Sequence, residues 1–182
     1  NRQLTCHHTE AGARKRFWLS SFGYIEGVAK AGRVWNDVPY PLLINPNANL
    51  SYTLQKESFA LMNPMEFIAD NYVSWESIYY MNGLLFNRLP LIKKLGWREV
   101  VDFKGFYGKL SPSNMPELTD SHGLYLFPRE NHQLTNTPYM EISFGVENIF
   151  KVLEVDYVRR LTYCDLPGIS KHGVRIRVHA QF

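Results

Sequence analysis

The sequence predicts an all-β fold of about seven antiparallel strands, and three observations lead to this prediction. The last ten residues, 173–182, alternate between apolar and polar side chains, which is the period of a strand with one apolar face. No stretch approaches the roughly 18 consecutive apolar residues of a transmembrane helix. Aromatic residues make up 14% of the chain and include 11 Tyr, which suits a surface that is apolar on one side and wet on the other.

The terminal strand is long enough to cross a bilayer, since a tilted transmembrane strand needs about nine to eleven residues. Its polar side carries Arg175, Arg177, His179 and Gln181. A terminal aromatic residue on such a strand resembles the insertion signal of bacterial outer-membrane β-barrels. The alternative is the last strand of a soluble sheet. The apolar side, predicted to form the insertion signal and terminal strand, consists of Val174, Ile176, Val178, Ala180 and Phe182.

Six further segments show strand-like alternation. The clearest is 138–149, where Met140, Ile142, Phe144 and Val146 alternate with polar residues and glycine. The segments 58–69 and 72–85 are expected to form a hairpin around a tight turn at 69–71. The complete set of preceding strand candidates is 14–30, 58–69, 72–85, 97–110, 138–149 and 153–164.

The connections differ in length and composition. Residues 1–13 are expected to be a loop, 31–57 is rich in Pro and Asn, and 111–137 is long and polar. Leu89, Ile92 and Leu95 recur at helical spacing between Pro90 and Gly96. This predicts one short amphipathic helix at 88–95, lying on a membrane surface or packed against the protein. If the C-terminus is periplasmic, 165–172, 111–137, 69–71 and 1–13 face outside, and 150–152, 86–96 and 31–57 face the periplasm.

Charge and cysteine usage exclude several function classes. The net charge of +3 is dispersed apart from the run Arg14 to Arg16, so no nucleic-acid partner is expected. Cys6, His7 and His8 are sequential neighbours, which favours a solvated loop over a metal site. We expect neither metal nor cofactor. Whether Cys6 and Cys164 form a disulfide stays open.

Strand length and aromatic placement favour a transmembrane barrel over a soluble sandwich. Apart from the longer 14–30, the strand candidates run 10–14 residues, against the usual five or six. Arg159 opposes the barrel because an Arg on the lipid face at mid-depth costs roughly 2–4 kcal/mol. Near predicted strand ends lie the expected interfacial aromatics Trp18, Trp75, Trp97, Tyr139, Phe150 and Tyr163, with Phe182 at the terminus. The predicted lumen-facing polar residues are Glu141, Glu147, Asp156, Arg160, Arg175, Arg177 and His179, and Glu76, Asp102 and Lys104 share the polar faces.

Several blocks of sequence resemble one family of Bacteroidota outer-membrane barrels, catalogued as domain of unknown function 5686. The resemblance covers about residues 16–182 and implies an outer-membrane barrel joined to a periplasmic β-sandwich, often a carboxypeptidase-regulatory-like domain. It implies no established activity and no catalytic residue. The blocks that carry it are 38–44, 60–67, 82–95, 97–100, 155–158 and 173–182.

The chain is therefore predicted to be the C-terminal part of a single barrel domain, 1–182, with upstream strands and any N-terminal domain missing. The expected function is transport or scaffolding in the bacterial outer membrane, without enzymatic activity. Expected partners are the lipid bilayer, the barrel-insertion machinery and further outer-membrane or periplasmic proteins. Two alternatives are a soluble β-sandwich or lipocalin-like binding module, and a barrel-borne hydrolase in which His179 pairs with Asp156 or Glu147.

Overall fold

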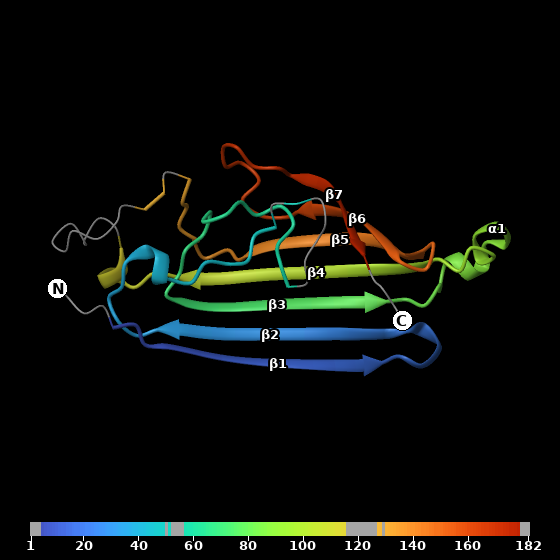
Figure 1. The fold of residues 1–182 in the computed structure, drawn as a ribbon, viewed down its shortest axis with the longest axis horizontal. Helices are drawn as coiled ribbons and strands as arrows, with labels where there is room; N and C mark the ends of the chain where they lie inside the picture. The colour runs from blue at the N-terminus through green and yellow to red at the C-terminus, as the bar shows by residue number, and fades with distance from the viewer. Residues whose placement is uncertain (1–4, 50, 52–56, 116–126, 129, 179–182) are drawn as a thin grey trace.

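The computed structural model describes residues 5–49, 51, 57–115, 127–128 and 130–178, and its strands form one antiparallel sheet (Figure 1). The order β1-β2-β3-β4-β5-β6-β7 follows the sequence, so each strand pairs with its chain neighbours. This confirms the predicted all-β chain of seven antiparallel strands. The strands are β1 (His8–Trp18), β2 (Tyr24–Val34), β3 (Asn71–Tyr80), β4 (Arg98–Lys109), β5 (Tyr139–Ile149), β6 (Leu153–Arg160) and β7 (His172–Val178).

Helical structure in the described residues is slight. The predicted helix at 88–95 is represented by α1 (Pro90–Lys93), and a 3-10 turn, η3 (Phe86–Arg88), precedes it. Three further 3-10 turns are η1 (Ser20–Phe22), η2 (Tyr40–Leu42) and η4 (Pro112–Asn114). No helix in the described part of the chain is long and apolar enough to span a membrane.

The first predicted strand, 14–30, is in fact the centre of a hairpin. β1 begins at His8, inside the stretch 1–13 that was expected to be a loop, and β2 continues to Val34. The turn between them depends on Gly23, whose φ is 95°, and a Cβ there would lie 1.9 Å from the backbone oxygen of Tyr80. Alternation alone did not reveal this turn because Trp18, Phe22, Tyr24 and Val28 keep the same parity through it.

The predicted strand 58–69 does not form, and neither does its hairpin with 72–85. The described residues of 35–70 instead run across one face of the sheet, and we call them the covering segment. It makes only two isolated bridges, Ile44 with Ala69 and Ala48 with Phe59. Pro64 lacks a backbone N–H, and the N–H groups of Ala60 and Leu61 are bound by a side chain rather than by a neighbouring strand.

The two faces of the sheet differ in polarity, and the covering segment lies on the polar one. Directly opposite residues in antiparallel strands have side chains on the same face. One such row contains an apolar or aromatic side chain from every strand. Following the register from β1 to β7, its members are Phe17, Ile25, Tyr79, Val101, Phe144, Tyr157 and Val174. We call this face the apolar face and the opposite one the polar face.

The apolar face is exposed. Phe17, Phe144, Tyr157 and Val174 in the row are 47–55% accessible, and Val178 on β7 reaches 63%. By contrast, residues of β4, β5 and β6 on the polar face, such as Asp102, Glu141 and Asp156, are at most 2% accessible. The polarity is therefore opposite to that of an ordinary soluble sheet, which buries its apolar side.

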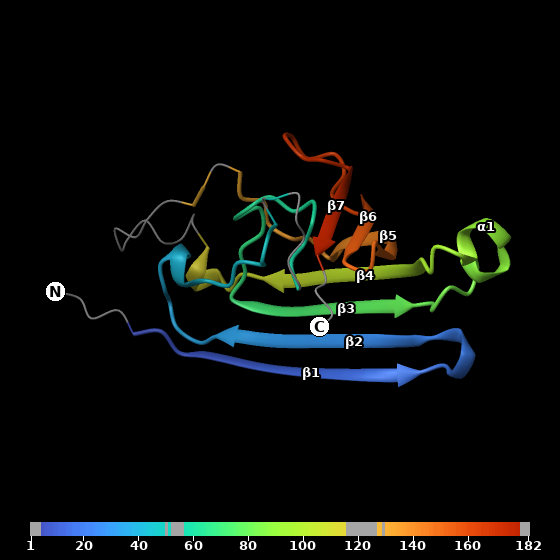
Figure 2. The same cartoon turned by 45° about the vertical axis from the view of Figure 1, so that its right-hand side comes forward.

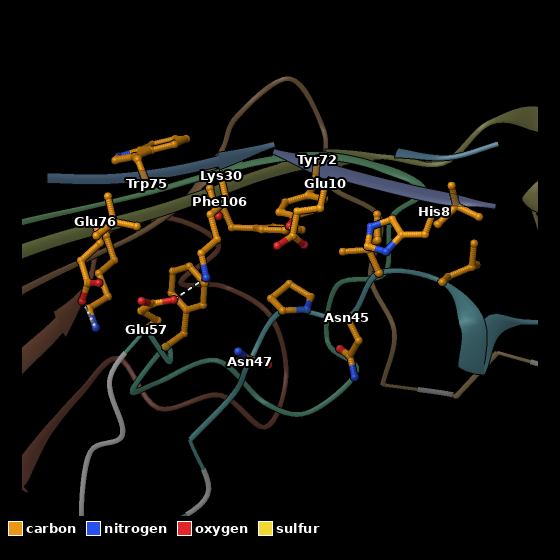
Figure 3. A pocket seen from close by; sticks show the side chains of 18 of the residues that line it. His8, Glu10, Lys30, Asn45, Asn47, Glu57, Tyr72, Trp75, Glu76 and Phe106 are labelled. Carbon is orange, nitrogen blue, oxygen red and sulfur yellow. Dashed lines mark hydrogen bonds and ion pairs between the residues drawn. The ribbon is translucent and has the colours of Figure 1, made fainter. Parts of the chain in front are cut away.

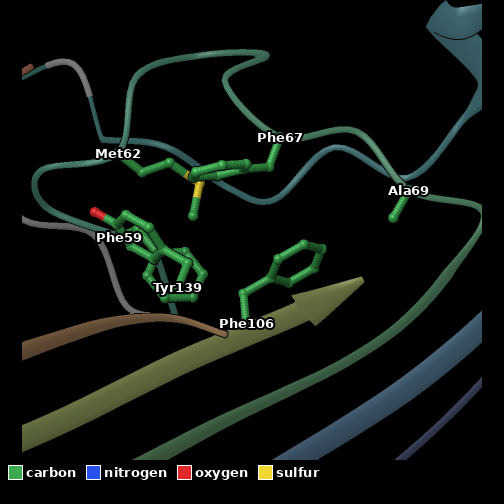
Figure 4. Packing of buried hydrophobic residues seen from close by; sticks show 6 residues of the cluster. All are labelled: Phe59, Met62, Phe67, Ala69, Phe106 and Tyr139. Carbon is green, nitrogen blue, oxygen red and sulfur yellow. The ribbon is translucent and has the colours of Figure 1, made fainter. Parts of the chain in front are cut away.

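The largest apolar cluster joins the covering segment to the polar face (Figure 4). Phe59 packs edge-on against Tyr139 of β5 and Phe106 of β4, with ring centroids 5.4 and 6.5 Å apart. A smaller cluster holds Leu61 against Val158 of β6. Val158 interrupts the polar alternation of its strand because it lies beneath this segment. The larger cluster consists of Phe59, Met62, Phe67, Ala69, Phe106 and Tyr139.

The sheet twists and curls, so that β6 and β7 stand steeply to β1 and β2 (Figure 2). The connections 19–23, 81–97 and 150–152 start and end at one end of the sheet, and those after β2, β4 and β6 start and end at the other. The tightest, between β5 and β6, uses Phe150 and Lys151, which both have positive φ as in a type I′ turn. The connection predicted at 31–57 was expected on the periplasmic side. Because β1 and β2 form a hairpin and β2 continues to Val34, this connection begins at the opposite end of the sheet, the same end as the connections after β4 and β6.

Candidate functional site on the polar face

The polar face carries a row of charges whose sign alternates from strand to strand. In register, Glu76 of β3 lies opposite Lys104 of β4, which lies opposite Glu141 of β5, which lies opposite Arg160 of β6. Opposite charges on neighbouring strands stabilise the pairing of a sheet. Their burial here requires that each charge also has polar partners.

One of these polar partners, Glu66, comes from the covering segment and binds Arg160. The guanidinium of Arg160 donates two hydrogen bonds to the carboxylate of Glu66, 2.5 Å and 3.2 Å long, and the two side chains are 0% and 2% accessible. Arg160 also donates to the backbone oxygen of Thr162 and lies 4.6 Å from the ring centroid of Tyr139. This bidentate pair fixes the covering segment to β6 in one geometry.

Glu141 holds the same segment through its backbone. Its carboxylate accepts hydrogen bonds from the N–H of Ala60 at 2.9 Å, the N–H of Leu61 at 2.8 Å and the hydroxyl of Tyr139 at 2.5 Å. A carboxylate can accept several such bonds, so it replaces the ladder that a strand at 58–69 would have needed. This is the physical reason why that segment is not a strand.

Two basic side chains bind carbonyl oxygens of the covering segment. Lys104 donates to the backbone oxygen of Ser58 at 3.1 Å, and Arg175 of β7 donates to that of Ala60 at 2.6 Å. Together with Arg160 and Glu141, they connect residues 58–66 to β4, β5, β6 and β7.

A buried ion-pair network lies beside this attachment. Lys104 is 2.6 Å from Glu76 and 3.3 Å from Asp102, and Arg177 of β7 lies 2.9 Å from Asp156 and 3.2 Å from Glu154. Arg177 also approaches Asp102 at 3.7 Å.

The contact between Arg177 of β7 and Asp102 of β4 crosses β5, and Gly145 of β5 makes it possible. A Cβ on Gly145 would lie 2.1 Å from the Oδ1 atom of Asp156. The absence of a side chain on Gly145 leaves room for the carboxylate of Asp156 and thereby for Arg177.

A cavity of about 350 Å³ opens between the polar face of β1–β4 and the covering segment (Figure 3). Glu10, Lys30 and Tyr72 point into it from the strands, while Asn47 and Glu57 approach from the covering segment (Figure 3). Lys30 is paired with Glu57, which also binds Arg14. Hydrogen bonding to Lys30 lowers the pKa of the Glu57 carboxyl.

The structure places most of the predicted lumen-facing residues on the polar face. Asp156, Arg160, Arg175 and Arg177 belong to the attachment and the ion-pair network described above, as does Glu141. Glu147 shares the face but lies opposite Arg98 near the end of β5, away from the covering segment. His179 lies outside the described residues, so its proposed pairing with Asp156 or Glu147 stays a prediction.

The terminal strand is partly described. Val174, Ile176 and Val178 lie on the exposed apolar face of β7, as the alternation predicts. Ala180 and Phe182 lie outside the described residues.

The predicted interfacial aromatics divide into three groups. Trp18 and Phe150 are exposed at the end of the sheet that carries 19–23, 81–97 and 150–152, and half-buried Trp97 lies there too. Trp75 lies in mid-strand over Gly105 on the apolar face. Tyr139 is fully buried and Tyr163 packs beside the same apolar cluster, so these two differ from the expectation of an exposed girdle position.

Sequence reasoning missed Glu66 and Glu154. Glu66 lies in the segment 58–69, which was predicted to be a strand, and it is 1% accessible. An acidic residue inside the apolar run Phe59–Ile68 is itself a signal, because a carboxylate in such a run needs a buried partner. Glu154 gave no such signal, because it follows the alternation of its strand.

The described residues hold no cluster of three or more His, Cys, Asp or Glu side chains arranged to bind a metal ion. Cys6 and Cys164 are both free cysteines. Comparisons of the chain with protein families, with curated proteins and with solved structures found no match. Function must therefore be inferred from the geometry alone.

Proposed function

We propose that this chain forms part of an integral outer-membrane β-barrel, with the apolar face toward lipid and the polar face toward the lumen. The observation that carries this proposal is the inverted polarity of the sheet. An apolar row of exposed and half-buried side chains runs through all seven strands, from Phe17 to Val174, while charged residues of the opposite face are buried beneath the covering segment. A barrel in a membrane has this distribution.

The ends of the sheet support the same arrangement. The end with the tight turns carries exposed Phe22 and Phe150, as aromatic girdles do, whereas Trp18 at the same end lies on the polar face. Around α1 at this end, Leu89, Leu91 and Leu95 are 49–83% accessible beside Lys93 and Lys94, which suits contact with a bilayer surface.

Arg159 lies on the apolar face opposite Ile142 of β5, and it is the penultimate residue of β6, next to the connection 161–171. The proposal requires that this end of β6 lies toward the rim, where charged side chains cost little.

In this proposal β1 and β7 pair with further strands, because a sheet edge cannot remain unpaired in lipid. The covering segment occupies the lumen, where its attachment to four strands would restrict free diffusion. A scaffold role, or transport that involves residues 35–70, follows from that position. Membership of the Bacteroidota barrel family that the sequence resembles is likewise a proposal. A two-sheet sandwich is not the arrangement of the described strands, which form one sheet.

Membrane fractionation tests the proposal directly. The full-length protein should appear in the outer-membrane fraction and require detergent for extraction. Phe144→Lys, on the apolar face, should cost roughly 2–4 kcal/mol in lipid and reduce the inserted amount. Leu42→Lys is the matched control, since Leu42 is 44% accessible against 55% for Phe144 but lies on the covering segment.

A soluble protein would tolerate both substitutions equally, because both side chains are exposed. Stable, monodisperse behaviour in plain buffer would contradict the proposal. The insertion-signal hypothesis is separate: Phe182→Asp should lower the inserted amount, and unchanged surface levels would argue against it.

A further inference from the structure

The cavity under the covering segment has one aromatic wall. Tyr72 of β3 stacks on Phe106 of β4 at 5.8 Å between ring centroids and an interplanar angle of 23°. Phe59 closes the wall edge-on to Phe106. Ligand cavities of roughly 300–1,000 Å³ combine such apolar walls with a few fixed polar groups, and this cavity lies at the small end of that range.

The other wall is polar, and its described charged groups are bound by neighbouring side chains. Lys30 binds Glu57, Lys104 lies 2.6 Å from Glu76, and the hydroxyl of Tyr72 donates to Glu10 at 2.5 Å. Asn45 and Asn47 add amide groups from the covering segment (Figure 3).

This pairing selects among ligand classes. An anion would find no surplus cation, because the ammonium groups of Lys30 and Lys104 are already held by carboxylates. A cation would have to compete with those ammonium groups for Glu57 and Glu76, or with the hydroxyl of Tyr72 for Glu10. A wholly apolar ligand would remove water from two ion pairs without replacing its hydrogen bonds. A neutral molecule with many hydroxyl groups avoids all three penalties.

We propose that this cavity binds a neutral sugar. The C–H face of a sugar ring would lie on the half-buried ring of Tyr72, which the buried Phe106 supports from behind. Its hydroxyl groups would donate to the carboxylates of Glu57 and Glu76 and accept from Lys30. This goes beyond the proposed membrane location, since the cavity is formed by described residues whether or not the sheet closes into a barrel.

Calorimetric titration of the full-length protein tests the proposal. The protein is held in an amine-oxide detergent, because alkyl-glycoside detergents would compete, or in plain buffer if it proves soluble. The probes are maltose and cellobiose as neutral sugars, glucose 6-phosphate as an anion and spermidine as a cation. We expect binding of at least one neutral disaccharide and weaker binding of the two charged probes.

Two serines of β3 give a matched pair of variants. Ser74 lines the cavity, whereas Ser77 is three residues along the same strand on the apolar face. Ser74→Leu should fill the space and lower the affinity at least about tenfold. Ser77→Leu should change it less than about twofold.

Tyr72→Phe keeps the aromatic wall but removes the hydroxyl, and should lower the affinity about two- to tenfold. It supplies the test if Ser74→Leu does not fold, as judged by circular dichroism. Absence of heat from either neutral sugar at about 10 mM would overturn the proposal. So would tighter binding of a charged probe, or equal affinities for the Ser74→Leu and Ser77→Leu proteins.

Discussion

The two halves of the sheet carry similar charged side chains on the polar face, but the covering segment binds only one half through buried charges. In the β1–β2 hairpin, Arg16 lies 3.0 Å from Glu26, with side chains 48% and 19% accessible. In the β4–β7 half, Arg160 is bound to Glu66 and both are at most 2% accessible. Exposed pairs contribute about 0–1 kcal/mol, whereas breaking a buried pair costs about 3–5 kcal/mol. Burial, rather than pairing alone, therefore sets the energetic effect of each contact.

The covering segment causes this difference. Its residues 58–66 bind β4–β7 through buried side chains and carbonyl oxygens. It reaches the N-terminal hairpin only through Glu57 among the ion pairs of its described residues, and Lys30 and Arg14 are its partly exposed partners. The cavity lies between the firmly attached part and the weakly attached one.

The largest expected effect comes from breaking the buried pair. Arg160→Met should lower the free energy of unfolding by about 3–5 kcal/mol, because Glu66 would keep a buried, unpaired charge. Arg16→Met is the matched change in the exposed half and should cost at most about 1 kcal/mol. Urea titration measures both, and similar losses would show that the two halves do not differ as described.

A smaller effect is expected from changing one acceptor. Glu141→Gln replaces a carboxylate oxygen with an NH₂ group that faces a backbone N–H, so one buried donor loses its partner. The expected cost is about 1–3 kcal/mol, with faster amide hydrogen exchange at Ala60 and Leu61. Glu26→Gln serves as the control and should leave these two amides unchanged. Unaltered exchange in Glu141→Gln would contradict the role given to this carboxylate.

Adding one methyl group at a glycine in each half compares how much space the two halves leave for a side chain. Gly145→Ala should cost about 1–3 kcal/mol, because the new methyl group displaces Asp156 from Arg177. Gly27→Ala should stabilise the protein by about 0.5–1 kcal/mol, since the nearest atom to its Cβ is 3.9 Å away and alanine loses less entropy. Thermal unfolding of both variants checks the opposite signs, and equal signs would refute the comparison.

The smallest effect is a pH dependence in the exposed half. Hydrogen bonding to Lys30 lowers the pKa of Glu57 below its usual value of 4.5. The stabilisation is therefore fully present above the unfolded pKa and is lost as the pH falls through the folded value. Its size is at most about 1 kcal/mol because the pair is partly exposed. Glu57→Gln should remove this dependence in denaturation curves at pH 3–6, and an unchanged curve would exclude Glu57 as the source.

Much of the fold follows from local alternation. The run Met140 to Val146 correctly predicted β5 and its apolar face, and Val174, Ile176 and Val178 did the same for β7. The total of seven strands was also correct, but partly through two compensating differences. The segment 14–30 proved to be parts of two strands, and 58–69 proved to be none.

The candidate site was only partly predictable for a related reason. Asp156, Arg160 and Arg177 were assigned to the correct face because side-chain period determines which residues share a face. Their partners Glu66 and Glu154 were missed, since no local pattern shows which distant residue a buried charge will bind.

The sequence by itself determined the strand period, the all-β class and the division of each strand into an apolar and a polar side. Only the tertiary structure decided which side is covered. That choice depends on residues 58–66 meeting Glu141 and Arg160, contacts between residues about 80 to 94 positions apart in the chain. A carboxylate can bind two backbone N–H groups wherever the fold places them, so such an attachment leaves no periodic trace in the sequence.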